Sequence, residues 1–370
     1  MSTCFEIRSS AADYSVSIET GLFASMLQEP GKDLLIADAW FSAHLAAAGR
    51  EAILIPANEM SKSLDAIPDL IVALRKHGAN RQTGLTALGG GVIQDMAAFV
   101  ASIYMRGLKW TYFPSTLLAM ADSCIGGKSS INVGPYKNLV GTFHPPQAVI
   151  IDPSLALTLS DEQRVGGLVE AVKICYCRGE DAFDEYMALG PQPSLTIEQV
   201  EKIVDCSLTA KKWFIEIDEF DQAERLLLNF GHTFGHAIEG ASHFSIEHGV
   251  GVGIGILCAI ALGRLIKRDY SVAGRVQILE EHLLTLLSAV PGLGPRLAEL
   301  PIEDVLDRFQ ADKKHGTNFY TTILIAESGK VELFRFPKDL HSTSLIQAAV
   351  LNATGSIAAP ISMSLKAHEI

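Results

Sequence analysis

The first part of the chain alternates short apolar runs with stretches of helical periodicity. The apolar runs are rich in β-branched residues and occupy 33–39, 51–57, 83–88, 110–116 and 147–153, while helical periodicity covers 64–77. Strands that alternate with helices in this way predict a parallel sheet covered by helices.

After Asp152 the periodicity becomes helical throughout. We predict helices at 161–178, 181–188, 197–215, 226–241, 249–267 and 273–288. The change falls near Leu159, where the sequence SLALTLSDEQR carries a helix-start signal. The prediction is therefore an α/β chain of two domains, 1–159 and 160–370, the second of them all helical.

Composition and charge narrow the class of protein. Of the 370 residues, 48% are hydrophobic and only 19% are charged, which is typical of a globular protein with much buried surface. The 42 acidic residues outnumber the 30 basic ones, so the net charge is −12, and there is no run of Lys or Arg. Nucleic acid is excluded as the main partner, because phosphate backbones are bound by clustered positive charge.

Neither a membrane segment nor a disulfide framework is expected. The most apolar stretch, Gly249 to Gly263, is shorter than the roughly 20 residues of a membrane span, so we predict a buried helix there. The N-terminal sequence MSTCFEIRSS lacks the basic start and apolar core of a signal peptide. The six cysteines form no C-x-x-C pair, so we expect reduced thiols and a cytoplasmic protein.

A glycine turn follows the predicted strand at 83–88. Gly89, Gly90 and Gly91 precede a predicted helix that carries Asp95. Glycines let a backbone approach a pyrophosphate, and the N–H groups at a helix start attract anions. A plain tight turn is the competing interpretation, because the pattern is not G-x-G-x-x-G.

Charged and polar side chains are concentrated among the glycines and prolines of 106–146. They are Arg106, Asp122, Lys128, Lys137, Asn138 and His144. Loops with several cations suit an anionic ligand, although any one of these side chains could equally be an ordinary solvated group.

Two histidines lie one helical turn apart within 226–241. Residues i and i+4 share a helix face, so His232 and His236 can converge, as can Arg225 and Asn229 one turn earlier. Neutral imidazole is a good zinc ligand, and a third ligand from elsewhere would leave a catalytic position open. A pair of structural core histidines is the alternative.

Two further side chains could complete such a site. Glu170 lies on a predicted apolar helix with Lys173 three residues later, which places a carboxylate and an ammonium on one face. His248 begins the glycine-rich helix. The competing interpretations are a simple ion pair and a solvated histidine at a helix boundary.

Taken together, these segments resemble one known family. The blocks GGGVIQD, PSTLLAMADSCIGGK, KNLVGTF, LVEAVK, RLLLNFGHTFGHAIE and ADKK, between about residues 59 and 314, occur in the order found in 3-dehydroquinate synthases and the wider group of sugar-phosphate cyclases. The resemblance implies a Rossmann-like N-terminal domain that holds NAD, a helical C-terminal domain that holds zinc or cobalt, and a homodimer.

The resemblance also implies roles for individual residues. Zinc would be held by Glu170, His232 and His248, although spacing alone would have made His236 a ligand. The NAD pocket would be lined by Asp38, Glu59, Lys62, Gly90, Gly91, Asp95, Ser115, Thr116, Asp122 and Lys137. The sugar phosphate would be held by Asp122, Lys128, Asn138, Lys173, Lys211, Asp221, Arg225, Asn229, His236 and Lys313, with Arg106 reaching the phosphate bound by the partner subunit. Lys314 is an alternative to Lys313.

The implied reaction is a redox-neutral cyclisation in the shikimate pathway, which leads to aromatic amino acids. NAD would accept and return a hydride, zinc would polarise a ring carbinol, and phosphate would leave before ring opening and an aldol closure. Dehydroquinate synthases receive the substrate carboxylate with a Lys, an Arg and an Asn, and Lys211, Arg225 and Asn229 stand at these positions. This favours 3-deoxy-arabino-heptulosonate 7-phosphate as the substrate.

Departures from the family pattern leave other functions open. Asp221 replaces a Glu, Gln94 replaces a Gly and Ser115 replaces a Thr, while Val250 occupies a position that is commonly acidic. One alternative is an amino-dehydroquinate synthase or a sedoheptulose 7-phosphate cyclase of secondary metabolism. The others are a metal-dependent polyol dehydrogenase, which would release NADH, and a non-catalytic paralogue.

Overall fold

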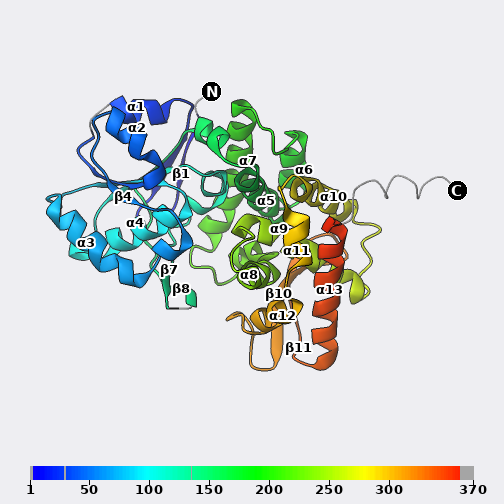
Figure 1. The fold of residues 1–370 in the computed structure, drawn as a ribbon. Helices are drawn as coiled ribbons and strands as arrows, with labels where there is room; N and C mark the ends of the chain where they lie inside the picture. Colours follow the sequence, from blue (N-terminus) through cyan, green and yellow to red (C-terminus); the bar gives the residue numbers. More distant parts are fainter. Residues whose placement is uncertain (1–2, 29–30, 135, 359–370) are drawn as a thin grey trace. The chain divides into compact units, whose positions relative to one another are not determined.

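The chain forms two compact units in the computed structural model, which describes residues 3–28, 31–134 and 136–358 (Figure 1). The first unit comprises Met1–Leu159 and Leu195–Phe220, and the second comprises Ser160–Ser194 and Asp221–Ile370. We predicted helix α7 (Ile197–Ile217) as part of the second domain, but it belongs to the first unit. The reason is that α7 packs against η5 (Ala119–Ser123) and η6 (Pro153–Thr158).

A seven-stranded sheet forms the centre of the first unit, in the order β1-β2-β9-β6-β5-β3-β4. The apolar runs of the sequence become its parallel strands β3 (Leu34–Asp38), β4 (Ile53–Ile55), β5 (Leu85–Gly89), β6 (Trp110–Pro114) and β9 (Ala148–Ile151). Strand β2 (Tyr14–Ile18) pairs in parallel with β9, and β1 (Thr3–Ile7) pairs antiparallel with β2. The sequence pattern predicted neither of these two strands.

The strand order of this sheet reverses between β3 and β5. The chain passes from β3 outward to β4 and then returns to β5 on the other side of β3. The connecting helices are α1 (Leu22–Gln28), α2 (Ser42–Ala47), α3 (Ile67–Lys76) and α4 (Gly91–Ile103), and a small hairpin of β7 (Ile131–Val133) and β8 (Tyr136–Val140) follows β6. Open α/β sheets bind ligands at the carboxyl ends of the strands where such a reversal occurs.

The second unit is mainly helical, which confirms the predicted fold class. Its helices are α5 (Asp161–Arg178), α6 (Glu180–Ala188), α8 (His232–Ala241), α9 (His248–Leu265), α10 (Gly274–Ser288), α11 (Leu293–Ala298), α12 (Ile302–Gln310) and α13 (Leu340–Ala358). The prediction of an all-helical domain was incomplete, because β10 (Phe319–Ile325) and β11 (Val331–Pro337) form an antiparallel hairpin.

The helix predicted at 226–241 is broken in two. The first piece is a 3-10 segment, η7 (Glu224–Asn229), and the second is α8, which begins after Gly231. The φ of Gly231 is 79°, in the left-handed region that favours glycine. The spacing had predicted that Arg225 and Asn229 lie on the same helix as His232. This prediction was wrong, because the two residues belong to η7.

Helix α9 lies against α5 and α8 at points where glycine backbones meet. A Cβ on Gly249 would lie 2.5 Å from Cα of Gly166 on α5, and a Cβ on Gly255 would lie 2.0 Å from the carbonyl oxygen of Gly231. By length and composition α9 could cross a membrane, but 78% of it is buried inside the protein. It is the buried helix predicted for this stretch.

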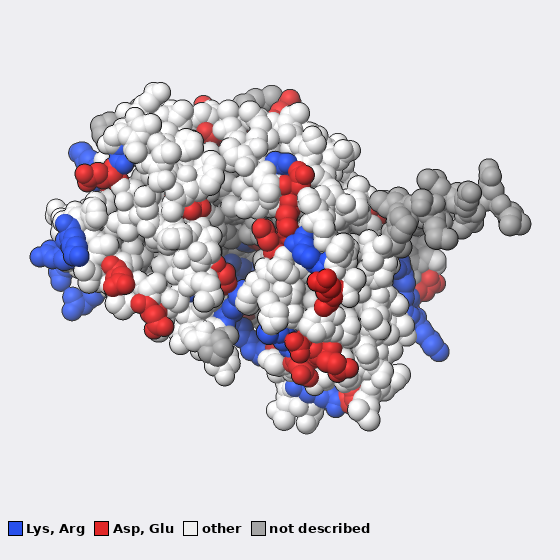
Figure 2. Space-filling view, viewed as in Figure 1, with Lys and Arg blue, Asp and Glu red and all other residues white. Residues whose placement is uncertain are grey.

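Charged side chains are intermixed on the face of the molecule shown in Figure 2. Lys and Arg form separate small groups there among acidic and uncharged side chains. Among the described residues on this face, no continuous basic surface is present.

Candidate functional site

The glycine turn and Asp38 lie at the carboxyl edge of the sheet, where the strand order reverses. Asp38 ends β3, and Gly90 and Gly91 connect β5 to α4. A Cβ on Gly90 would lie 2.9 Å from Cγ2 of Thr116, whereas a Cβ on Gly91 would meet nothing within 4 Å. No side chain caps the N-terminus of α4. The turn therefore combines open space with helix N–H groups, which is what an anionic ligand requires.

The expected NAD-binding side chains that follow β4 form one network with the β7–β8 hairpin. Lys62 Nζ lies 2.9 Å from Asp95 Oδ2, 2.9 Å from Asn138 Oδ1 and 3.7 Å from Glu59 Oε1. Lys137 Nζ lies 3.6 Å from the same Glu59 oxygen. Burial raises the pKa of Asp95 to about 6, although the adjacent Lys62 opposes this shift.

Two expected substrate-binding residues of the first unit, Asp122 and Lys211, are paired. The Lys211 ammonium lies 2.5 Å from Asp122 Oδ1 and donates to the carbonyl oxygens of Asp122 (2.5 Å) and Ile125 (3.2 Å). An ammonium has three N–H donors, so all three point at acceptors of the first unit. Lys211 would have to break one of these contacts to bind a substrate carboxylate.

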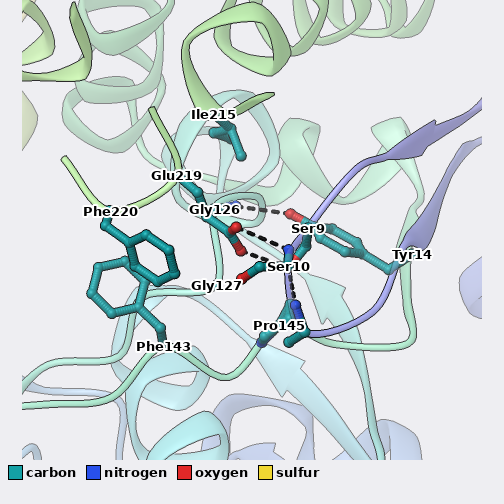
Figure 3. Close-up of a pocket in the computed structure, with 11 residues that line it drawn as sticks. Ser9, Ser10, Tyr14, Gly126, Gly127, Phe143, Pro145, Ile215, Glu219 and Phe220 are labelled. Atoms are coloured by element: carbon teal, nitrogen blue, oxygen red, sulfur yellow. Dashed lines mark hydrogen bonds between the residues drawn. The ribbon is translucent and has the colours of Figure 1, made fainter. Parts of the chain in front are cut away.

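The loop that precedes Lys128 is held by the N-terminal hairpin. Gly126 N–H donates to Tyr14 Oη over 2.9 Å, and Ser9 Oγ donates to Glu219 over 2.6 Å (Figure 3). These groups line a cavity of about 50 Å³. It is too small for a dinucleotide or a sugar phosphate, so we assign it a structural role. Lys128 itself is exposed and lies 6.0 Å from the centre of the Phe143 ring.

Arg106 lies away from this group. It follows α4 and precedes β6, at the amino edge of the sheet, opposite to the glycine turn. Met105 and Arg106 have φ angles of 48° and 74°, and both are exposed. A larger cavity of about 540 Å³ lies at the same edge, lined in part by Arg81 and Lys109. Within one chain the structure therefore does not bring Arg106 to the other expected site residues of the first unit.

Four candidate metal ligands converge in the second unit. The ring nitrogens of His232, His236 and His248 lie within 4.8 Å of one another. Oε1 of Glu170 lies 3.5 Å from Nε2 of His248 and 3.7 Å from Nε2 of His232. Two atoms that each lie about 2.0 Å from a tetrahedral zinc ion are about 3.3 Å apart, and the distances from Glu170 to His232 and His248 are close to this spacing.

The surroundings of Glu170 also suit a cation. Its side chain is 1% exposed, Lys173 forms an ion pair with Oε2, and Oε1 faces the two histidine rings. Burial alone would raise the pKa of Glu170, but Lys173 and His248 lower it well below its ordinary value. A buried carboxylate whose second oxygen faces imidazoles is a suitable site for zinc or cobalt.

The protonation states of the histidines differ. Burial lowers the pKa of His236 to about 3, and that of His232 falls well below its ordinary value for the same reason. Burial acts in this direction on His248 too, but Glu170 and Glu239 raise its pKa to about 9. The neutral rings of His232 and His236 keep a lone pair for a metal ion, whereas His248 would release a proton on binding one.

For two residues near this cluster the sequence analysis gave no role or no decision. Glu239 Oε2 lies 3.2 Å from Nδ1 of His248 and so orients that ring. Its position on α8, three residues after His236, could have indicated that it lies near the histidines. Lys314 lies close enough to lower the pKa of both His232 and His236, and it is half-buried, whereas Lys313 is exposed.

The remaining expected substrate contacts of the second unit surround η7. Arg225 is 4% exposed, and Asn229 Nδ2 donates to Leu226 O over 3.0 Å. This segment packs on α5, where Cys177 Sγ donates to Leu227 O over 3.5 Å. Because α5 also carries Glu170 and Lys173, η7 lies beside the helix of the metal cluster. Asp221 has a left-handed φ of 62° at the start of this stretch.

Comparisons with known proteins give the family. The model of the 3-dehydroquinate synthase N-terminal region matches residues 52–165, and that of the C-terminal region matches residues 167–315. The 3-dehydroquinate synthase of Latilactobacillus sakei is 33% identical, over 90% of this chain and 95% of that protein. The enzyme of the same name from Enterococcus faecalis is 39% identical, over 88% of this chain and 94% of that protein.

A solved structure agrees in fold. The crystal structure of 2-deoxy-scyllo-inosose synthase complexed with carbaglucose-6-phosphate, NAD⁺ and Co²⁺ has a TM-score of 0.82 and 21% sequence identity, covering 95% of this chain and 99% of that chain. At this identity the likeness concerns the fold alone. Two family models that together span 52–315, and relatives identical at a third or more of positions over most of their length, lead to one conclusion: the chain belongs to the 3-dehydroquinate synthase family.

Proposed function

We propose that the protein is a 3-dehydroquinate synthase that uses NAD and a divalent metal ion, zinc or cobalt. It converts 3-deoxy-arabino-heptulosonate 7-phosphate to 3-dehydroquinate and phosphate. The observation that carries the proposal is the convergence of Glu170, His232 and His248 in a chain of this family. The same relatives support a place in the shikimate pathway.

The two units would contribute different parts of the reaction. The first would hold NAD at the carboxyl edge of its sheet, with the pyrophosphate at the uncapped start of α4 and Asp38 on a ribose. The second would hold the metal ion with Glu170, His232 and His248. When bound, NAD would supply a reversible hydride acceptor and the metal a Lewis acid for the substrate hydroxyl.

Other side chains would bind and orient the sugar phosphate. His236, neutral and one turn after His232 on α8, would accept a hydrogen bond or a proton at the phosphate-bearing end. Lys314 and Lys173 would supply positive charge close to it. The planar guanidinium of Arg225 and the amide of Asn229 would receive the carboxylate, whereas Lys211 would first have to give up one of its contacts in the first unit.

Phosphate release tests this proposal directly. Metal-replete protein with NAD would be given 3-deoxy-arabino-heptulosonate 7-phosphate and sedoheptulose 7-phosphate separately, with product masses read in parallel. We expect release from the first substrate alone, with formation of dehydroquinate. Release only from the second would show that the carboxylate assignment is wrong, and release from neither would direct attention to an amino-sugar substrate.

We also propose a cellular location and an oligomeric state from the family resemblance. We expect the protein to act in the cytoplasm as a homodimer in which Arg106 reaches the partner's phosphate site. Its exposed position on a left-handed turn supports this role, because the side chain is presented outward from its own sheet.

A further inference from the structure

Gln94 is a buried polar residue to which the proposed reaction gives no role. It is 4% exposed and lies in the first turn of α4, where its N–H donates to the carbonyl oxygen of Gly90 over 3.0 Å. Its amide forms two reciprocal hydrogen bonds with Ser123. Gln94 Nε2 donates to Ser123 O, and Ser123 Oγ donates to Gln94 Oε1, each over 2.6 Å.

Ser123 belongs to η5, a π-helical turn whose carbonyl groups are held by side chains. Ser207 Oγ donates to Ala121 O over 2.8 Å, and Lys211 Nζ donates to Asp122 O over 2.5 Å. Together with the bond from α4 to Ser123, three successive carbonyls are bound by side chains of two different helices. π-helical turns are rare and are found mostly at functional sites.

We infer that Gln94 is a positioning residue, which fixes Asp122 relative to the Gly90 turn. Ser123 directly follows Asp122, whose carboxylate is paired with Lys211. The main chain of Gln94 closes the first turn of α4 on Gly90, while its side chain anchors the residue next to Asp122. The inference rests on the proposed function in one respect, namely that Asp122 contacts NAD or substrate.

The resemblance described above implies a glycine at this position. A glycine there could not form either hydrogen bond to Ser123. In this protein both bonds come from the side chain of Gln94. Both amide atoms of Gln94 are directed at Ser123, and the residue is 4% exposed, so its side chain presents little surface to a ligand. Gln94 therefore acts through Asp122 and does not touch the substrate.

A double-mutant cycle tests this inference. Gln94→Leu removes both hydrogen bonds at nearly constant volume, and Asp122→Asn removes the charge that Gln94 is inferred to position. The full-length protein would be assayed with Zn²⁺ present, by NAD titration without substrate, by kcat and KM, and by thermal unfolding. The single variants, the pair and the native protein make up the cycle.

The expected result separates positioning from stability. Gln94→Leu should raise the Kd for NAD at least 3-fold and lower kcat/KM at least 5-fold. In the Asp122→Asn background the same substitution should change either quantity less than 2-fold, while its shift in Tm stays the same in both backgrounds. Equal fold-changes in both backgrounds, or no change in either quantity, would overturn the inference.

A control and a second variant keep the test decisive. Ser102→Ala removes a 2.7 Å bond to Phe99 O on the same helix and should leave Kd and kcat/KM unchanged. If Gln94→Leu fails to fold, Ser123→Ala removes only one of the two bonds and should give the same pattern at smaller size. Should the native protein release no phosphate, the proposed function fails, but the cycle in the Kd for NAD still decides the role of Gln94.

Discussion

Single side chains in the second unit are held in one protonation state by what surrounds them. The pKa values of half-buried His232 and exposed His236 both lie below the ordinary value, so these rings are neutral, while Glu170 is ionised although only 1% of its side chain is exposed. An ionised carboxylate is costly to bury unless cations compensate it. Lys173 supplies one cation, and the proposed metal ion would supply the larger part.

His232→Ala should therefore abolish metal content and turnover together. Two remaining protein ligands rarely hold zinc, so we expect the metal affinity to fall more than about tenfold. Metal analysis after dialysis against a weak chelator measures it. His341→Ala, an exposed histidine on α13, is the matched control and should keep its metal. Normal zinc content with full activity in the His232 variant would contradict the assignment.

Arg225→Ala should weaken turnover of a substrate that carries a carboxylate. A hydrogen bond to a charged group contributes about 1.5–3 kcal/mol, so kcat/KM should fall by about 10- to 100-fold. Arg225→Lys keeps the charge but not the planar pair of donors, and its loss should be intermediate. Steady-state kinetics of the three proteins decide this, and unchanged values would mean that the carboxylate binds elsewhere.

Asp95 gives the first unit a predictable pH dependence. Its pKa is about 6 in the folded protein against 3.8 in the unfolded chain, so the folded state binds more protons between these values. Stability from this group is present below pH 3.8 and is lost as the pH rises through 6, by about 3 kcal/mol at most. In Asp95→Asn the unfolding free energy should no longer fall between pH 4 and 6. Denaturant unfolding at several pH values measures this slope, and an unaltered slope would exclude Asp95 as its source.

At the scale of whole elements, the metal cluster depends on how closely three helices approach. Glu170 lies on α5, His232 and His236 on α8, and His248 on α9. Glycine contacts on both sides of α9 allow backbones to touch where any side chain would separate them.

Gly249→Ala should push α9 away from α5. The added Cβ would lie 2.5 Å from backbone atoms of Gly166, which cannot rotate aside. We expect a loss of about 2 kcal/mol or more in unfolding free energy, together with weaker metal binding. Gly355→Ala on α13 is the control, since a Cβ there meets nothing within 4 Å, and it should raise stability by up to about 1 kcal/mol. Similar behaviour of both variants would contradict the proposed contact.

Periodicity was sufficient for elements with a long or strongly apolar pattern. The parallel strands and the helices α5, α9 and α10 lie within a few residues of their predicted bounds. Strand β1 has no clear alternation, and the alternating sequence YSVSI of β2, which is a strand signal, was overlooked because it covers only five residues. The break at Gly231 was missed because the spacing of apolar residues continues across it. Only the positive φ of Gly231 interrupts the helix.

Site residues were predictable where a motif fixed them and uncertain where packing decides. The ordered motifs placed Glu170 and the three histidines, which the structure brings together. Neighbouring lysines at 313 and 314 cannot be separated by sequence, because which of them faces the histidines depends on the turn after α12. The Lys211 contacts likewise depend on α7 packing with the first unit.

At the scale of the whole molecule, the proposed reaction has no net oxidation. Phosphate and dehydroquinate should form in equal amounts while the absorbance of NADH stays constant, because the hydride is returned. Omitting NAD from protein stripped of cofactor should stop the release of phosphate. A dehydrogenase would instead accumulate NADH in proportion to substrate consumed, which a single spectrophotometric trace distinguishes.

The composition of α9 has a consequence for how the protein reaches its native state. Its sequence, HGVGVGIGILCAIALGRL, contains five glycines, each costing about 1 kcal/mol of helix stability relative to alanine. Such a segment does not hold a helix in water by itself, so it becomes helical only while docking on α5 and α8. His248 thus reaches Glu170 only when α9 has docked. A nascent chain would be unable to capture its metal ion before the second unit has closed around this helix, which makes metal loading a report on completed folding.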